Sequence, residues 1–189
     1  MGLVLLAAPV SSATAQFAPW SVGIFGGGQF LTGDLGDFFN TGWVAGANVD
    51  YRFSEGRSPV SIRLDISYGS SSAKDLGTGS SSSIDAKANS IYGFAYALLH
   101  PNIGQAEDRA TVDLYAGGGG GFVNSKCSGS DCGDTSGQTD GALVGVVGGA
   151  APIGSVYLFF EGRWVLVFAE DQSESRFPVV AGVRIPFGG

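Results

Sequence analysis

The chain has 189 residues, of which 44% are hydrophobic and only 14% are charged, and its formal net charge at pH 7 is −7. Charged residues make up about 25% of a typical soluble domain. No apolar run reaches the roughly 18 residues that a transmembrane helix needs, which excludes a helical membrane protein. The acidic balance argues against a protein that binds nucleic acid or polyanionic glycans.

The first 15 residues have the pattern of an export signal. An apolar segment, residues 1–10, is followed by Ala13-Thr14-Ala15, which has the A-x-A form of a cleavage site. The positively charged segment that normally comes first is missing, so we expect an upstream start codon or a truncated leader. A short buried helix is the alternative. We divide the chain into a signal peptide, residues 1–15, and one domain, residues 16–189.

The remaining chain alternates apolar and polar side chains in eight segments separated by Gly/Ser/Asp-rich breaks. Successive side chains of a strand point to opposite faces, so each segment has one apolar and one polar face. The 32 glycines also disfavour helices. The predicted strands are Trp20–Leu31, Trp43–Phe53, Val60–Tyr68, Ala88–Leu99, Thr111–Phe122, Ala142–Ala150, Ser155–Phe168 and Phe177–Phe187.

The connections between these strands alternate between long and short. The predicted long loops are 32–42, 69–87, 123–141 and 169–176, and they contain ten acidic residues. The predicted turns are 54–59, 100–110 and 151–154. Barrels of bacterial outer membranes have short periplasmic turns and long external loops. The pattern predicts an all-β protein, an eight-stranded antiparallel transmembrane β-barrel with periplasmic termini and long outer loops.

The apolar face of the strands is expected to contact lipid. Aromatic residues should form a belt at each interface, since outer-membrane barrels carry such belts. The expected periplasmic belt is Trp20, Tyr51, Phe53 and Phe187, and the expected outer belt is Trp43, Tyr68, Phe122, Phe168 and Phe177. Between the belts we expect Ile62, Leu64, Ile66, Val112, Leu114, Leu158, Phe160, Val183 and Ile185. Tyr92, Tyr96 and Trp164 lie nearer the middle of their strands.

The opposite face is predicted to line the lumen. Four acidic and four basic residues lie on it: Asp50, Arg52, Arg63, Asp65, Asp113, Glu161, Arg163 and Arg184, together with Asn48, Tyr115 and Tyr157. Side chains fill the interior of an eight-stranded barrel, and charges buried there must be paired. These positions favour a lumen closed by salt bridges. The alternative is a charged conduction path controlled by Arg63, Asp65, Glu161 and Arg163.

Two cysteines, Cys127 and Cys132, lie close together in one predicted loop. In an exported chain such a pair predicts a small disulfide loop, which stabilises the fold by about 2 kcal/mol in the entropy model. A metal site is the competing interpretation, but no histidine or further cysteine is nearby.

The sequence offers no enzyme site. The only histidine, His100, precedes Pro101 and is predicted to be a turn residue. The glycine tract 116–121 lacks the Gly-Lys-Ser/Thr of a phosphate loop, and residues 134–140 lack the terminal Glu of a calcium loop. We therefore expect no catalytic residue, no cofactor and no metal site.

The alternating strands, above all residues 156–164, resemble small outer-membrane barrels of Gram-negative bacteria, namely the OmpA-type transmembrane domain and the opacity-type surface proteins. In the last strand, alternate apolar residues lead to Phe187, which is similar to the signal that the barrel-assembly machinery reads, although Gly188 and Gly189 follow it here. The resemblance specifies architecture and implies an outer-membrane location.

The function predicted from the sequence is non-enzymatic. We expect a monomer that contacts outer-membrane lipid and lipopolysaccharide, and that acts in envelope integrity or binds an unidentified surface ligand through its acidic loops. A narrow passive channel for small solutes is the alternative. A soluble lipocalin-type barrel, which would place its apolar face inside, is the third hypothesis.

Overall fold

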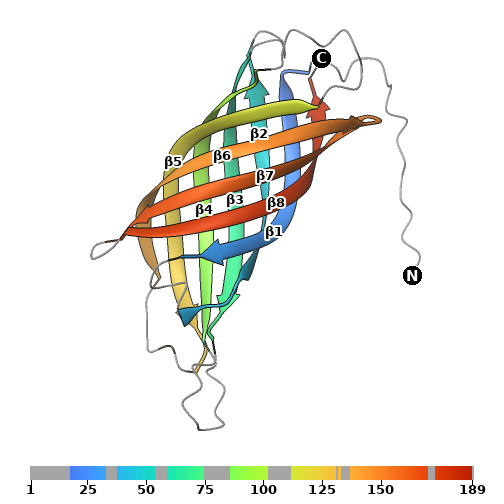
Figure 1. Ribbon diagram of the computed structural model, residues 1–189. Helices are drawn as coiled ribbons and strands as arrows, with labels where there is room; N and C mark the ends of the chain where they lie inside the picture. Colours follow the sequence, from blue (N-terminus) through green and yellow to red (C-terminus); the bar gives the residue numbers. More distant parts are fainter. Residues whose placement is uncertain are drawn as a thin grey trace, which may run out of the picture.

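The protein is described by a computed structural model that covers residues 18–32, 38–53, 59–74, 86–101, 112–130, 132, 137–169 and 173–188. Its strands form a closed barrel in which each strand is antiparallel to both neighbours and β1 pairs with β8 (Figure 1). The strands are β1 Trp20–Leu31, β2 Gly42–Arg52, β3 Val60–Ser72, β4 Lys87–Leu99, β5 Asp113–Ser128, β6 Gln138–Ile153, β7 Val156–Phe168 and β8 Ser173–Phe187. The predicted fold class, an all-β eight-stranded antiparallel barrel, is confirmed.

Among the described residues, no helix has the length and apolar character to cross a membrane. The predicted signal peptide, residues 1–15, lies outside the described part of the chain.

Several strands run further into the predicted long loops than the alternation indicated. β5 continues to Ser128 rather than ending at Phe122, and β6 begins at Gln138 rather than Ala142. β8 begins at Ser173, so part of the predicted loop 169–176 is strand. Backbone hydrogen bonds hold these extensions together whatever the side chains are. The apolar–polar alternation stops earlier because both faces of the extensions carry polar groups.

The two ends of the barrel differ. One end, which we call the terminal rim, holds the start of β1 and the end of β8, since Trp20 pairs with Phe187. The turn between β6 and β7 also lies there and passes through Gly154, whose φ of +63° suits glycine. The opposite end, the loop rim, holds the β1–β2, β3–β4, β5–β6 and β7–β8 connections, whereas the β4–β5 connection, residues 100–112, belongs to the terminal rim.

The outer surface of the barrel is apolar. All the residues predicted to face lipid point outward, and Ile24 is the most exposed of the large hydrophobic side chains in the described part of the chain, at 68%. The expected belt residues also face outward at the two rims, where Trp20 packs on Tyr51 with ring centroids 4.6 Å apart and Trp43 on Tyr68 at 5.5 Å. The mid-strand Tyr92 and Tyr96 instead face the lumen. This is the reverse of a lipocalin-type barrel, which encloses its apolar face.

The glycine tract of the sequence is part of β5 and not a loop. A Cβ atom on Gly117, Gly119 or Gly121 would overlap the backbone of β4. The inward face of β4 carries large side chains, among them Phe94 and Leu98, which fill the space that these glycines leave. The glycine tract therefore allows β5 to pack closely against β4.

Candidate functional site

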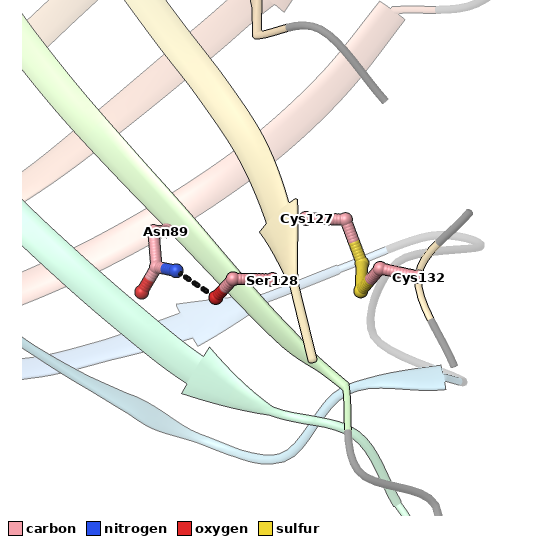
Figure 2. Close-up of a disulfide and its surroundings, with 4 residues drawn as sticks. All are labelled: Asn89, Cys127, Ser128 and Cys132. Atoms are coloured by element: carbon pink, nitrogen blue, oxygen red, sulfur yellow. Dashed lines mark hydrogen bonds between the residues drawn. A yellow bond between two sulfur atoms is a disulfide. The ribbon is translucent and has the colours of Figure 1, made fainter. Parts of the chain in front are cut away.

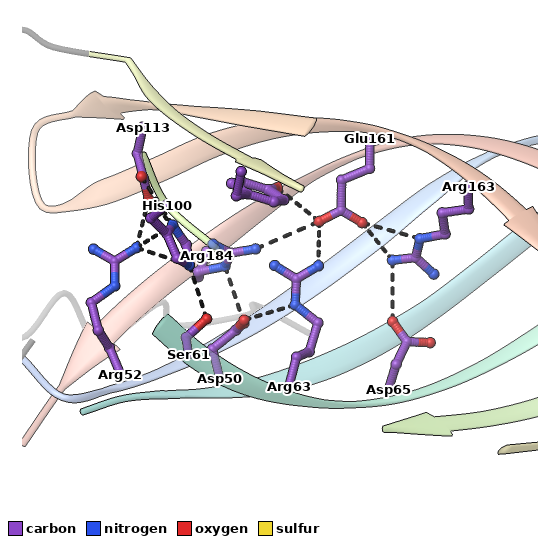
Figure 3. A network of polar contacts seen from close by, with 11 residues as sticks. Asp50, Arg52, Ser61, Arg63, Asp65, His100, Asp113, Glu161, Arg163 and Arg184 are labelled. Carbon is purple, nitrogen blue, oxygen red and sulfur yellow. Dashed lines mark hydrogen bonds and ion pairs between the residues drawn. The ribbon is translucent and has the colours of Figure 1, made fainter. Parts of the chain in front are cut away.

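The central network occupies the middle of the lumen and comprises Asp50, Arg63, Asp65, Glu161, Arg163 and Arg184 (Figure 3). Arg63 donates from Nε to Asp50 Oδ1 at 2.7 Å and from Nη1 to Glu161 Oε1. The side chains of Arg63 and Glu161 are both 0% exposed. These two residues, 98 positions apart in the sequence, join β3 to β7 across the barrel.

Glu161 is the hub of this network. Its Oε2 accepts from Nε and Nη2 of Arg163, at 3.0 and 2.8 Å, and its Oε1 also accepts from the Tyr115 hydroxyl at 2.7 Å. Arg163 Nη2 lies 3.1 Å from Asp65 Oδ2. A buried carboxylate is costly unless its lone pairs are satisfied, and here the partners come from β5, β3 and β7.

Arg184 completes the central network from β8. Its Nε lies 3.3 Å from Asp50 Oδ2 and its Nη2 3.7 Å from Glu161 Oε1. Neither contact is a hydrogen bond, so both act as ion pairs only. The guanidinium also lies over the Phe159 ring, 4.9 Å from its centroid, as Arg163 lies over Phe25 at 4.3 Å. These cation–π contacts add a second source of stabilisation.

The terminal cluster lies at the terminal rim and comprises Arg52, Ser61, His100 and Asp113. Arg52 Nη2 donates to Asp113 Oδ2 at 2.7 Å, and Ser61 Oγ lies 2.9 Å from His100 Nε2. His100 lies just beyond β4 at the start of the predicted turn, but its side chain is 1% exposed and points into the lumen, which was not predicted. His100 continues the series of inward side chains Tyr96 and Leu98 of β4. The strand period of two, carried on past Leu99, would have predicted that it faces the lumen.

Ser61, His100 and Asp113 are connected in the order of a serine-hydrolase triad. His100 Nδ1 lies 3.0 Å from Asp113 Oδ1, but Arg52 Nη2 also lies 2.7 Å from that same nitrogen. A guanidinium only donates, and the same Nη2 also lies 3.4 Å from His100 Nε2, so Arg52 competes with Asp113 for the imidazole. Ser61 is itself 2% exposed, which closes its hydroxyl off from a substrate. The geometry is that of a structural network.

The loop cluster closes the other end of the lumen and comprises Gln29, Ser71, Ser90, Tyr92, Ser125, Glu174 and Arg176. Arg176 donates to the Tyr92 hydroxyl at 2.9 Å and pairs with Glu174 at 3.1 Å. The sequence placed Arg176 in an outer loop, which is wrong, because it lies on β8 and faces the lumen. Gln29, which accepts from Tyr92 at 2.8 Å, was missed, since a single amide in a glycine-rich strand gives no signal.

All eight charged residues predicted to line the lumen therefore point into it. The central network holds three arginines and three carboxylates, the terminal cluster one of each, and the loop cluster one of each. The central network, the terminal cluster and the loop cluster are therefore each electrically neutral.

A few buried polar atoms beside the central network make no hydrogen bond within the described part of the chain. They include both amide atoms of Asn48 and the Tyr96 hydroxyl. Asn48 pairs in register with Asp65, whose carboxylate contacts Arg163 without hydrogen-bond geometry. Polar groups of this kind usually hold ordered water.

A disulfide joins Cys127, near the end of β5, to Cys132, with 5.7 Å between the two Cα atoms (Figure 2). It lies in the β5–β6 connection at the loop rim. The described residues contain no group of three or more His, Cys, Asp or Glu side chains arranged to hold a metal ion.

The fold and the filled, charged lumen define a small eight-stranded barrel of the outer-membrane type. No family model and no curated protein matches the chain. Among solved structures, it is similar to Neisserial surface protein A (NspA), with a TM-score of 0.61 and 18% identity over 90% of this chain and 98% of that one. It is also similar to the outer membrane protein OprG from Pseudomonas aeruginosa, with a TM-score of 0.57 and 13% identity over 93% and 99% of the two chains. At these identities the likeness shows the fold.

Proposed function

We propose that the chain is a non-enzymatic outer-membrane protein whose lumen is closed by paired charges, and that it acts in envelope integrity or in surface contact through its loops. The observation that carries this proposal is the central network. Arg63 and Glu161 meet in the middle of the lumen with no exposed side-chain surface. A small solute would have to separate this pair in order to pass.

The outer-membrane location is supported by the apolar outer wall and by the two similar solved structures. Soluble proteins rarely expose apolar patches of more than a few hundred Å², whereas here every strand has an apolar outward face. We place the terminal rim in the periplasm and the loop rim outside, as in barrels of this type.

Single-channel recording in planar bilayers tests the closed lumen. The refolded domain is first checked by its heat-dependent gel mobility, and we then expect no discrete conductance steps. Glu161→Gln weakens the hub, so we expect brief openings from that variant. Glu174→Gln, which changes the carboxylate of the loop cluster, 28% exposed, is the matched control and should stay silent. Stable steps from the folded wild-type protein would overturn the proposal.

A narrow passive channel is the second candidate function. The observation that favours it is the group of buried polar atoms without a hydrogen bond at Asn48, Asp65 and Tyr96, in and beside the central network. If these polar atoms line a solute path, the wild-type protein will conduct. Arg63→Ala and Glu161→Ala will then change its ion selectivity in opposite directions. The same bilayer recording therefore separates the two functions.

A further inference from the structure

The two kinds of basic residue occupy different parts of the barrel. All five described arginines face the lumen, where carboxylates pair with them. The three lysines of the chain, Lys74, Lys87 and Lys126, all lie near the loop rim, on or next to β3, β4 and β5. Lys87 and Lys126 are exposed and point outward. Lysine binds phosphate as a compact point charge, and arginine, which also binds phosphate, is used here in buried ion pairs.

Lys87 and Lys126 are neighbours on one face of the sheet. In the β4–β5 register Lys87 pairs with Ser128, and Asn89 pairs with Lys126. The two lysines are therefore diagonal neighbours on the outward face, within about 7–8 Å between their backbones. We call Lys87, Asn89, Lys126 and Ser128 the lysine strip.

Hydrogen bonds hold the polar residues of the strip. The Tyr68 hydroxyl donates to Asn89 Oδ1 at 2.9 Å, and Asn89 Nδ2 donates to Ser128 Oγ at 2.6 Å (Figure 2). Because Ser128 Oγ accepts this bond, its own proton is available to an acceptor beside Lys87. Neither lysine forms an ion pair with any residue in the described part of the chain.

In the proposed membrane orientation the strip begins just outside the lipid headgroups, and Lys126 is the lysine of the strip on the same strand as the belt residue Phe122. Lys126 is four residues beyond the belt residue Phe122 on β5, which is about 13 Å along a strand and about 9 Å along the membrane normal at a tilt of about 45°. The headgroup layer extends about 5–8 Å beyond the hydrocarbon on each side. A lysine side chain can bend back toward it across such a difference.

We propose that Lys87 and Lys126, with the Ser128 hydroxyl between them, bind a phosphate group of a phosphorylated glycolipid in the outer leaflet, the lipid A part of lipopolysaccharide. This rests on the proposed outer-membrane location. The two ammonium groups neutralise the phosphate, and the hydroxyl donates to one of its oxygens. The apolar wall below the belt receives the acyl chains, so a lipid phosphate binds here in preference to a free one.

The test uses the refolded domain in neutral detergent, titrated with purified lipid A and with the same lipid after enzymatic removal of its phosphates. Binding is read as a shift of the thermal unfolding midpoint. We expect the phosphorylated lipid to bind at least about tenfold tighter. Each lysine near an anionic lipid surface raises the affinity about fivefold. The double variant Lys87→Gln/Lys126→Gln should lose this preference.

Lys74→Gln is the matched control, because it removes the same charge at the same rim but outside the strip, and it should keep the preference. All variants must show the heat-dependent gel shift of a folded barrel. Equal binding of both lipids by the wild type, or a preference kept by the double variant, would contradict the proposal. So would full competition by millimolar inorganic phosphate, which would identify a free-anion site. A soluble wild-type protein that does not enter bilayers would instead contradict the proposed function.

Discussion

At the scale of single residues, Arg63 is the side chain that joins two carboxylates of the central network. Arg63→Ala leaves the buried Asp50 without its hydrogen-bonded partner and Glu161 without one of its arginines, so we expect the free energy of unfolding to fall by about 3–5 kcal/mol. Arg63→Lys keeps the charge but lacks the forked guanidinium that reaches both Asp50 and Glu161. Its free energy of unfolding should therefore lie between those of the wild type and Arg63→Ala. Urea titration in lipid vesicles, followed by tryptophan fluorescence, measures these differences. A loss below about 1 kcal/mol for Arg63→Ala would mean that the network relaxes around the gap.

His100 gives the barrel a pH dependence of defined sign. It lies one residue beyond the end of β4, and burial lowers its pKa below the usual value despite the hydrogen bond with Asp113. The unfolded chain, with a histidine pKa of about 6.5, therefore binds the proton first as the pH falls. Stability should be constant above about pH 6.5 and decrease below it until the folded state is also protonated.

The unfolding midpoint in urea, measured at pH 7.5 and 5.5, tests this. His100→Gln keeps a polar side chain that cannot titrate, so its midpoint should change less than that of the wild type over the same interval. Identical changes in both proteins would assign the pH dependence to other groups.

At the scale of elements, the packing of β4 on β5 depends on glycine. A Cβ on Gly119 would overlap the backbone oxygen of Ala95, so Gly119→Ala must push the two strands apart. We expect it to destabilise the barrel by about 2–3 kcal/mol, as overpacking does. Gly145→Ala, on β6, is the control, because nothing lies within 4 Å of the added Cβ and alanine is less costly than glycine in a strand. Equal unfolding midpoints for the two variants would contradict the close approach of β4 and β5.

Individual strands also show which features of the fold can be predicted from the sequence. The alternation in β3 predicted both faces of that strand, because a period of two is a local property of the backbone. The extensions of β5 and β6 were not predictable, since the alternation ends where both faces carry polar side chains. His100 and Arg176 lie next to or near a proline and so resembled turn or loop residues. The pairing of Arg63 with Glu161 depends on how the barrel closes, which no single strand encodes.

At the scale of the whole molecule, the charges of the lumen clusters cancel, and the net charge of the chain comes from the residues outside these clusters. The three lumen clusters hold five arginines and five carboxylates. These cancel, so the formal net charge of −7 belongs entirely to residues outside the clusters. The charge pairs of the clusters close the lumen, and the net charge is left to residues that take no part in this closure.

This division predicts the effect of salt on stability. Buried pairs are screened much less than exposed ones, so raising NaCl from about 0.05 to 0.5 M should leave the urea midpoint unchanged or raise it slightly, as repulsion among exterior acids is screened. If the lumen were open to ions, they would reach Asp50, Arg63 and Glu161, and the midpoint would fall with salt. Glu161→Gln, with its weakened hub, should move toward that second behaviour. A decrease in the wild-type protein equal to that of the variant would show that water and ions already reach the network, and the barrel would then be a channel.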